Sequence, residues 1–124
     1  MLVSIVILES LFFFVMGSVA LASPRFVTSL FGELEIGADM RNEVRAVYGG
    51  FGVAIGALLL VSMWMPGIQS GVLITVGVAL LGMALGRFIS FLIEPVEGKL
   101  PALFAVVEVF LGGALLLASW INSY

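Results

Sequence analysis

The chain has 124 residues, of which 62% are hydrophobic and 10% are charged, and its formal net charge is -3. This composition is far from that of soluble domains, so the sequence predicts an integral membrane protein. The chain has no cysteine, no histidine and no basic run. We therefore expect no disulfide, no metal site, no imidazole catalysis and no nucleic acid as a partner.

Four apolar stretches, at about residues 2–22, 41–64, 70–93 and 101–121, are each close to the roughly 20 residues that cross a hydrocarbon core. None has the alternating polarity of a membrane-spanning strand, so each is expected to be a helix. The predicted fold class is all-α. It is an antiparallel, up-down four-helix bundle, and residues 1–124 form a single transmembrane domain in the lipid bilayer.

The first stretch resembles a secretory signal at one point, because Ala20-Leu21-Ala22 has the pattern of a cleavage site. It lacks a basic n-region, however, and Glu9 interrupts its apolar core. We interpret it as a retained membrane span. Ser23 and Pro24 predict the end of this helix, because the residue before a proline disfavours the helical conformation.

The connection formed by residues 25–40 is the longest, and the roughly helical spacing of its apolar residues predicts a short interfacial helix or a re-entrant turn. Asp39 is expected to cap the second span. The segment Met65-Pro66-Gly67 is expected to end that span. Only residues 68–70 then remain before the third span, which predicts a tight antiparallel hairpin.

The last connection, residues 94–100, is polar, and Pro101 is expected at the first position of the fourth helix. With four spans, both termini lie on one side of the membrane. All of the basic residues belong to the other side: Arg25, Arg41, Arg45, Arg87 and Lys99. The positive-inside rule makes that side cytoplasmic and the termini periplasmic.

Small residues mark one face of the second span. Arg45, Gly49, Gly52 and Gly56 lie at positions i, i+4, i+7 and i+11, which share a face of a 3.6-residue helix. A glycine face lets a neighbouring helix approach closely in a membrane. We therefore expect Arg45 to point at protein and not at lipid.

Each span carries a charged side chain, and these are expected to form a buried polar cluster with one tyrosine: Glu9, Arg45, Tyr48, Arg87 and Glu108. A helical rise of about 1.5 Å per residue places the two arginines and Glu108 roughly 6 to 11 Å from the cytoplasmic side. Unpaired charges in a bilayer cost between about 2.5 and over 10 kcal/mol, so the arginines are expected to pair with the glutamates. Three residues closer to water are expected to rim the opening: Arg41, Asn42 and Glu43.

The cluster is open to three interpretations: a structural lock, a binding pocket, or a path for protons or ions. We adopt the pocket as the functional hypothesis, with a lipophilic ligand that has a polar head, such as a quinone or a lipid. The alternative is a non-catalytic accessory or structural subunit of a larger membrane complex or homo-oligomer. An enzyme ranks third, because nucleophile, metal cluster and histidine are missing, and the sequence indicates no particular cofactor.

The string from Asn42 to Gly50, together with Gly86-Arg87 and Glu108, resembles domain-of-unknown-function family 4345. Its most specific part is an Arg-Ala-x-Tyr-Gly-Gly motif, carried by Arg45, Ala46, Tyr48, Gly49 and Gly50. The loop at 94–101 departs from the family's Asp-Gly-x-Pro-like turn. The resemblance implies a four-helix fold, a bacterial inner membrane and a relationship to the DoxX-like group, some members of which are associated with quinone-linked or thiol redox systems. Without cysteine, this chain cannot itself perform thiol chemistry.

Overall fold

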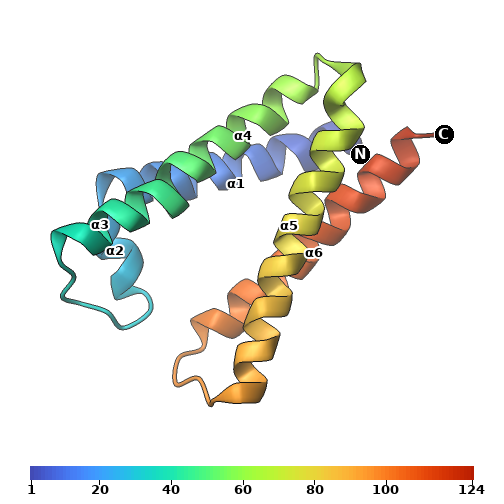
Figure 1. Ribbon diagram of the computed structural model, residues 1–124. Helices are drawn as coiled ribbons and strands as arrows, with labels where there is room; N and C mark the ends of the chain where they lie inside the picture. Colours follow the sequence, from blue (N-terminus) through green and yellow to red (C-terminus); the bar gives the residue numbers. More distant parts are fainter.

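The computed structural model describes residues 1–124, and its regular structure is entirely helical (Figure 1). The elements in chain order are α1 (Leu2–Ala22), α2 (Pro24–Ser29), α3 (Ala38–Val44), the π-helix η1 (Arg45–Gly50), α4 (Phe51–Ser62), α5 (Pro66–Ile93) and α6 (Leu100–Asn122). The elements α3, η1 and α4 follow one another without a break and form a single long helix. The predicted all-α four-helix fold is confirmed.

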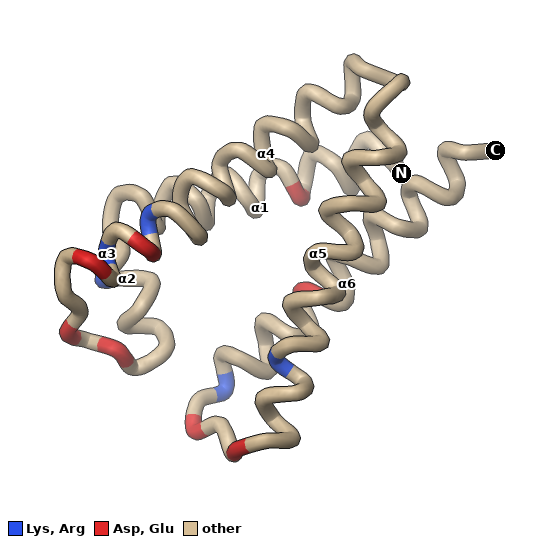
Figure 2. The backbone as a smooth tube through the Cα atoms, in the orientation of Figure 1, with Lys and Arg blue, Asp and Glu red and all other residues tan.

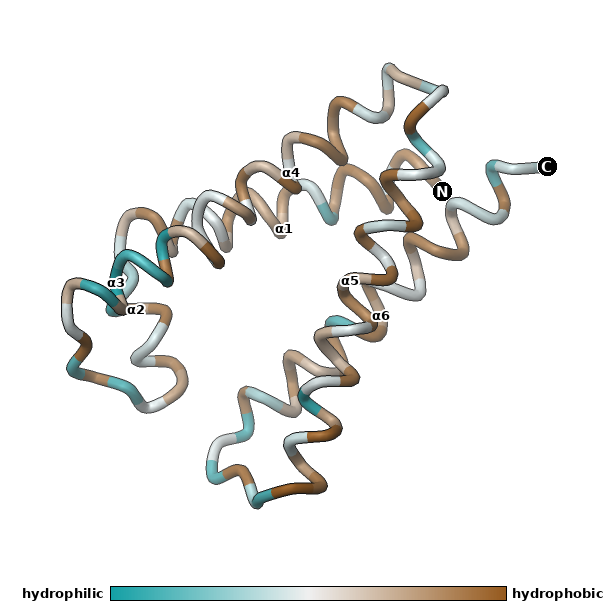
Figure 3. The backbone as a smooth tube through the Cα atoms, in the orientation of Figure 1, coloured by the Kyte–Doolittle hydropathy of each residue, from teal (hydrophilic) through white to brown (hydrophobic).

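Four helices are long and apolar enough to cross a membrane, and they have 21, 25, 28 and 23 residues. At about 1.5 Å per residue, each is long enough for a hydrocarbon core about 30 Å thick. Only 25 of the 124 residues are buried, so most apolar side chains point away from the protein. Figure 3 shows these apolar residues along the long helices, with polar residues gathered near the helix ends. The chain is therefore a multi-pass membrane protein.

The four spans pair into two arms. In the first arm α1 packs along η1 and α4, and in the second arm α5 packs along α6. The arms meet at the end that holds both termini and the turn between α4 and α5, and they diverge toward the other end (Figure 1). The bundle is therefore open at the end opposite the termini.

Glycines allow the helices within each arm to approach closely. A Cβ atom on Gly17 of α1 would lie 2.6 Å from the backbone nitrogen of Val53 and 2.8 Å from the carbonyl oxygen of Gly49. In the second arm, a Cβ atom on Gly112 would lie 2.8 Å from the carbonyl oxygen of Gly77. The glycine face predicted for the second span is thus the face that contacts a neighbouring helix.

The arms are joined by an apolar core to which all four spans contribute: Val6, Leu59, Val72, Leu73, Val76, Leu80, Leu111, Leu115 and Ala118. Hydrogen bonds reinforce the same end of the second arm. The hydroxyl groups of Ser70 and Ser119 are 2.8 Å apart, and the Asn122 amide donates to Gln69 at 3.1 Å. The end that holds the termini is therefore the tightly packed end of the molecule.

The helix boundaries differ from prediction at both ends of the second span and at the start of the third, and Pro101 is the second residue of α6 and not the first. The third span begins at Pro66 and not at residue 70, because a proline in the first helical turn has no hydrogen bond to lose. The second span begins at Ala38, with Gly37 at its N-cap. Asp39 makes no capping hydrogen bond, so the predicted cap is wrong, but its carboxylate in the first turn still favours the positive end of the helix dipole.

The segment between α1 and α3 folds back on itself and contains the short helix α2, as predicted for this connection. Gly32 has a φ of 87°, a left-handed conformation in which a side chain would be strained. Further along, Nη1 of Arg41 donates to the carbonyl oxygen of Ile36 at 2.7 Å. This bond ties the extended residues before α3 to that helix.

Charges are distributed unevenly along the molecule. Figure 2 shows that the lysine and arginine positions lie toward the diverging ends of the arms. Half of the acidic residues lie there too, in the segments that connect α1 to α3 and α5 to α6, and two more belong to α3. The end that holds the termini has no lysine or arginine, so the predicted separation of basic residues from the termini is present in the fold.

Candidate functional site

Arg87 on α5 and Glu108 on α6 form a two-pronged ion pair. Nε of Arg87 donates to both carboxylate oxygens of Glu108, at 3.0 and 2.9 Å, and Nη2 donates to Oε1 at 2.9 Å. The Glu108 side chain is 5% exposed and the Arg87 side chain is 22% exposed. Paired geometry of this kind offsets much of the cost of removing both charges from water. Of the arginine–glutamate pairs that the sequence left open, this one is present.

Aromatic side chains extend this pair from one arm to the other. The guanidinium carbon of Arg87 lies 5.4 Å from the ring centroid of Phe104, which is a favourable position for a cation over an aromatic face. Phe104 also stacks on Phe31, with ring centroids 5.8 Å apart and an interplanar angle of 25°. Because Phe31 follows α2 and Phe104 belongs to α6, this stack joins the two arms where they diverge.

Arg45 does not join the ion pair, so the prediction that it shares a common interior with the other charges is wrong. Its Nε donates to the carbonyl oxygen of Leu21 at 3.1 Å, and the residue is exposed. The physical reason is that α1 ends at Ala22, and carbonyl groups in the last turn of a helix lack intrahelical partners. Arg45 therefore binds the end of a neighbouring helix, but it is exposed and does not lie on the buried glycine face as predicted.

The π-helix explains why Arg45 leaves the predicted face. The backbone N–H of Phe51 bonds to the carbonyl of Ala46, five residues earlier, so the turn holds an extra residue. Arg45 therefore shares a face of the helix with Gly50 and not with Gly49. Arg45 and Gly50 are both exposed, whereas Gly49 is buried. In the sequence, the paired glycines were the only cue to this irregular turn.

Glu9 also lies apart from the ion pair, and its predicted place in the cluster is wrong. It is 1% exposed, and neither carboxylate oxygen has a hydrogen-bond partner; the neighbouring Ser10 hydroxyl has none either. The neighbouring residues Val6, Phe12 and Phe13 belong to or pack against the core that joins the arms. The predicted depths of these residues in the membrane assumed that the four helices run parallel. The helices diverge instead, and the pair of Arg87 and Glu108 lies toward the end where the arms are apart.

We expect Glu9→Leu to raise the free energy of unfolding by about 1 kcal/mol or more, because it removes a buried polar group that lacks a partner. Glu108→Leu is the matched control. It should lower that free energy, since it leaves Arg87 unpaired. Both can be measured by reversible unfolding in detergent micelles. Equal destabilisation by the two substitutions would mean that Glu9 has a partner.

A cavity of about 440 Å³ lies between the arms, and we call it the inter-arm cavity. Eighteen residues line it, and 15 of them are hydrophobic. Both arms contribute apolar side chains to the wall, among them Phe12, Met16, Phe31, Phe51, Leu80 and Leu111. Its polar side chains are those of Tyr48, Arg87 and Glu108. The structure therefore brings three of the five residues predicted for the polar cluster to one cavity.

The residues predicted to rim the opening lie outside the cavity wall. Asn42 and Glu43 are exposed on α3, and Arg41 bonds to the backbone. The wall is instead formed by the following turn, η1, through Ala46, Val47 and Tyr48. Sequence reasoning also missed Phe31 and Phe104, because nothing distinguishes them from the other phenylalanines until the fold brings them together.

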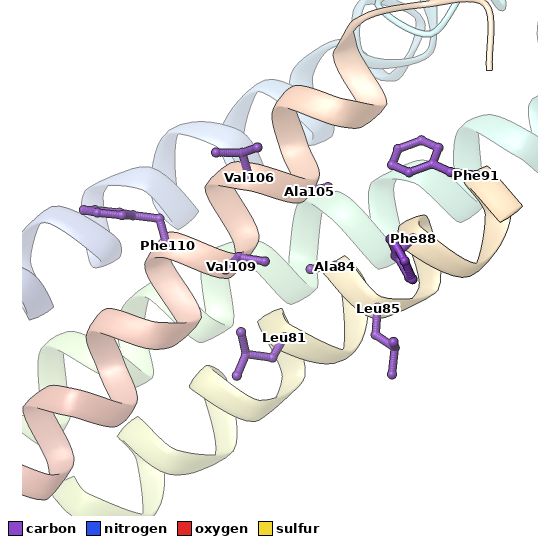
Figure 4. A pocket seen from close by; sticks show the side chains of 9 residues that line it. All are labelled: Leu81, Ala84, Leu85, Phe88, Phe91, Ala105, Val106, Val109 and Phe110. Carbon is purple, nitrogen blue, oxygen red and sulfur yellow. The ribbon is translucent and has the colours of Figure 1, made fainter. Parts of the chain in front are cut away.

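A second hollow, of about 590 Å³, lies on a different face of α5 and α6, and we call it the outer groove. Figure 4 shows its nine apolar lining residues: Leu81, Ala84, Leu85, Phe88, Phe91, Ala105, Val106, Val109 and Phe110. No polar side chain is present to orient a ligand. The outer groove therefore suits an acyl chain or an apolar protein surface, and the inter-arm cavity is the candidate site.

Fold and site together define a four-span membrane protein whose two helical hairpins enclose an apolar cavity with one partly buried ion pair. A family described as Domain of unknown function (DUF4345) matches residues 1–119, and the chain belongs to that family. This is the family that the sequence string around Arg45 resembles. Neither the curated proteins nor the solved structures contain a match to the chain.

Proposed function

We propose that the inter-arm cavity binds a lipophilic molecule with a polar head, such as a quinone or a lipid. The observation that carries this proposal is an apolar cavity of about 440 Å³ with a single ion pair in its wall. Small-molecule sites typically have about 300 to 1,000 Å³, mostly apolar walls and a few polar groups that fix orientation. A structural lock alone would need the pair but not the cavity beside it.

Polar groups from both arms are available to bind the head of such a molecule. Arg87 comes from α5, and both N–H groups of its Nη1 lack a protein partner. Tyr48 comes from η1 in the other arm, and its hydroxyl also lacks a protein partner. Both groups can donate hydrogen bonds. A head group that accepts from either would therefore be oriented at the cavity wall.

We expect Val47→Trp to abolish ligand retention, because the larger side chain fills the cavity. Val109→Trp in the outer groove is a matched control, since the two valines are 50% and 53% exposed. The measurement is native mass spectrometry after extraction in mild detergent, followed by analysis of the released molecules. If a bound molecule survives Val47→Trp and is lost in Val109→Trp, the inter-arm cavity is not the binding site.

The second candidate function is that of a non-catalytic accessory subunit. Two features favour it: the outer groove, and the open space around Gly82 and Gly86 on α5, where an added Cβ atom would meet nothing within 4 Å. Both could receive a helix from a larger membrane complex or from a second copy. The same mass spectra separate the two functions, because a subunit would be extracted with large partners and without a bound small molecule.

We further propose that the protein lies in a bacterial inner membrane with both termini in the periplasm, because the basic residues gather at the opposite end. The chain has no cysteine, so single cysteines report cleanly. Ser123→Cys should react with an impermeant maleimide in intact spheroplasts, and Glu97→Cys should react only after the membrane is permeabilised. The reversed pattern would overturn this orientation.

A further inference from the structure

We propose that the inter-arm cavity selects uncharged molecules with a hydrogen-bond acceptor, and that Glu108 is the residue that sets this selectivity. The inference rests on the proposed function, because it concerns the ligand of the same cavity. It follows from the charge of the cavity wall and from the hydrogen bonds that Arg87 leaves unused.

The charge of the wall is already balanced. Arg87 and Glu108 are its only charged residues, and they bind each other through three hydrogen bonds of 2.9 to 3.0 Å. An anionic head would bring a further negative charge next to a neutral pair in an apolar cavity. A charge without a partner is strongly disfavoured in such surroundings.

An anion could instead compete with Glu108 for Arg87, but the geometry opposes this. The Glu108 side chain is 5% exposed and would remain buried on α6 without its partner. Such a displacement would pair Arg87 with the anion but leave the carboxylate of Glu108 without a partner. The structure therefore favours ligands that leave the pair intact.

Arg87 still has hydrogen bonds to offer to an uncharged group. Its Nε and one N–H of Nη2 are used by Glu108, whereas both N–H groups of Nη1 lack a protein partner. The ring of Phe104 covers the guanidinium of Arg87. A ligand can therefore bind the guanidinium through the unused N–H groups at its edge. A carbonyl, ester or ether oxygen matches these donors, and both a quinone and an uncharged lipid carry such an oxygen.

The test uses two lipids with the same acyl chains, dioleoylglycerol and dioleoylphosphatidic acid, which differ by one phosphate group. Decylubiquinone serves as a third probe, because it is uncharged and has no acyl chains. Binding to the full-length protein in detergent is measured by native mass spectrometry. We expect the wild-type protein to bind dioleoylglycerol or decylubiquinone at least tenfold more tightly than the phosphatidic acid. Whichever uncharged probe binds more tightly identifies the ligand as a lipid or a quinone.

Glu108→Gln is the decisive variant, since glutamine has nearly the same shape and keeps an oxygen that can accept from Arg87. Its cavity carries one net positive charge, so the preference should reverse in favour of the phosphatidic acid. An unchanged preference in a folded Glu108→Gln variant would overturn the proposal. If this variant does not fold, the wild-type comparison still decides, because tighter binding of the phosphatidic acid contradicts the proposal.

Val47→Trp separates this inference from the proposed function. If none of the three probes binds the wild-type protein, or if Val47→Trp leaves their binding unchanged, the proposed function itself fails. If Val47→Trp abolishes binding but the wild-type protein prefers the phosphatidic acid, only the selectivity assigned to Glu108 fails.

Discussion

Glu108→Ala should lower the free energy of unfolding by about 3 to 5 kcal/mol, the largest effect that we expect from a single substitution. The alanine removes the acceptor of three hydrogen bonds and leaves the Arg87 guanidinium charged in an apolar cavity. Reversible unfolding in detergent micelles gives the measurement. Arg45→Ala is the control, and it should cost less than about 1 kcal/mol because that residue is exposed and makes one hydrogen bond.

A double-mutant cycle shows whether this cost belongs to the pair. Removing Arg87 and Glu108 together should cost less than the sum of the two single substitutions, by about 0.5 to 3 kcal/mol, because the double variant contains no unpaired charge. Strictly additive values would mean that the two side chains do not stabilise each other in the folded protein.

Gly17→Ala should destabilise the first arm by about 1 to 3 kcal/mol, because there is no room for one more carbon atom. The new Cβ atom would lie 2.6 Å from the backbone nitrogen of Val53, and a backbone atom cannot rotate away. The same substitution at Gly86 has open space around it and should stabilise α5 by about 0.5 to 1 kcal/mol, since alanine favours a helix.

Opposite signs for the two alanine substitutions would establish that close helix contact, and not helix propensity, determines the effect at Gly17. Thermal unfolding in the same detergent is sufficient to compare them. Stabilisation by Gly17→Ala would contradict the close packing of α1 against α4.

The fold was largely predictable because it depends on local and additive properties of the chain. Four apolar stretches of spanning length can only be helices in lipid, and α1 begins and ends at the predicted residues. Prolines marked the helix ends, although Pro66 proved to begin a helix and not to end one. The divergence of the arms was not predictable, because it results from contacts among all four spans.

The site was only partly predictable, for two physical reasons. The expectation that an arginine pairs with a glutamate follows from the cost of charge in a membrane, but that cost does not determine which residues pair. The positions of Arg45 and Glu9 depend on the irregular turn at η1 and on the divergence of the helices. Glu9 also shows that a buried carboxyl group can lack a protein partner, so the presence of a titratable residue in a span does not guarantee a pair.

The divergence of the two arms has a consequence for the surrounding bilayer. A molecule that is narrow at the end with its termini and wide at the other end displaces different areas of lipid in the two leaflets. Insertion therefore expands one leaflet more than the other, and the resulting lateral stress is smallest where the membrane already curves to match. Spontaneous curvature of the host membrane should thus influence where this wedge-shaped protein accumulates.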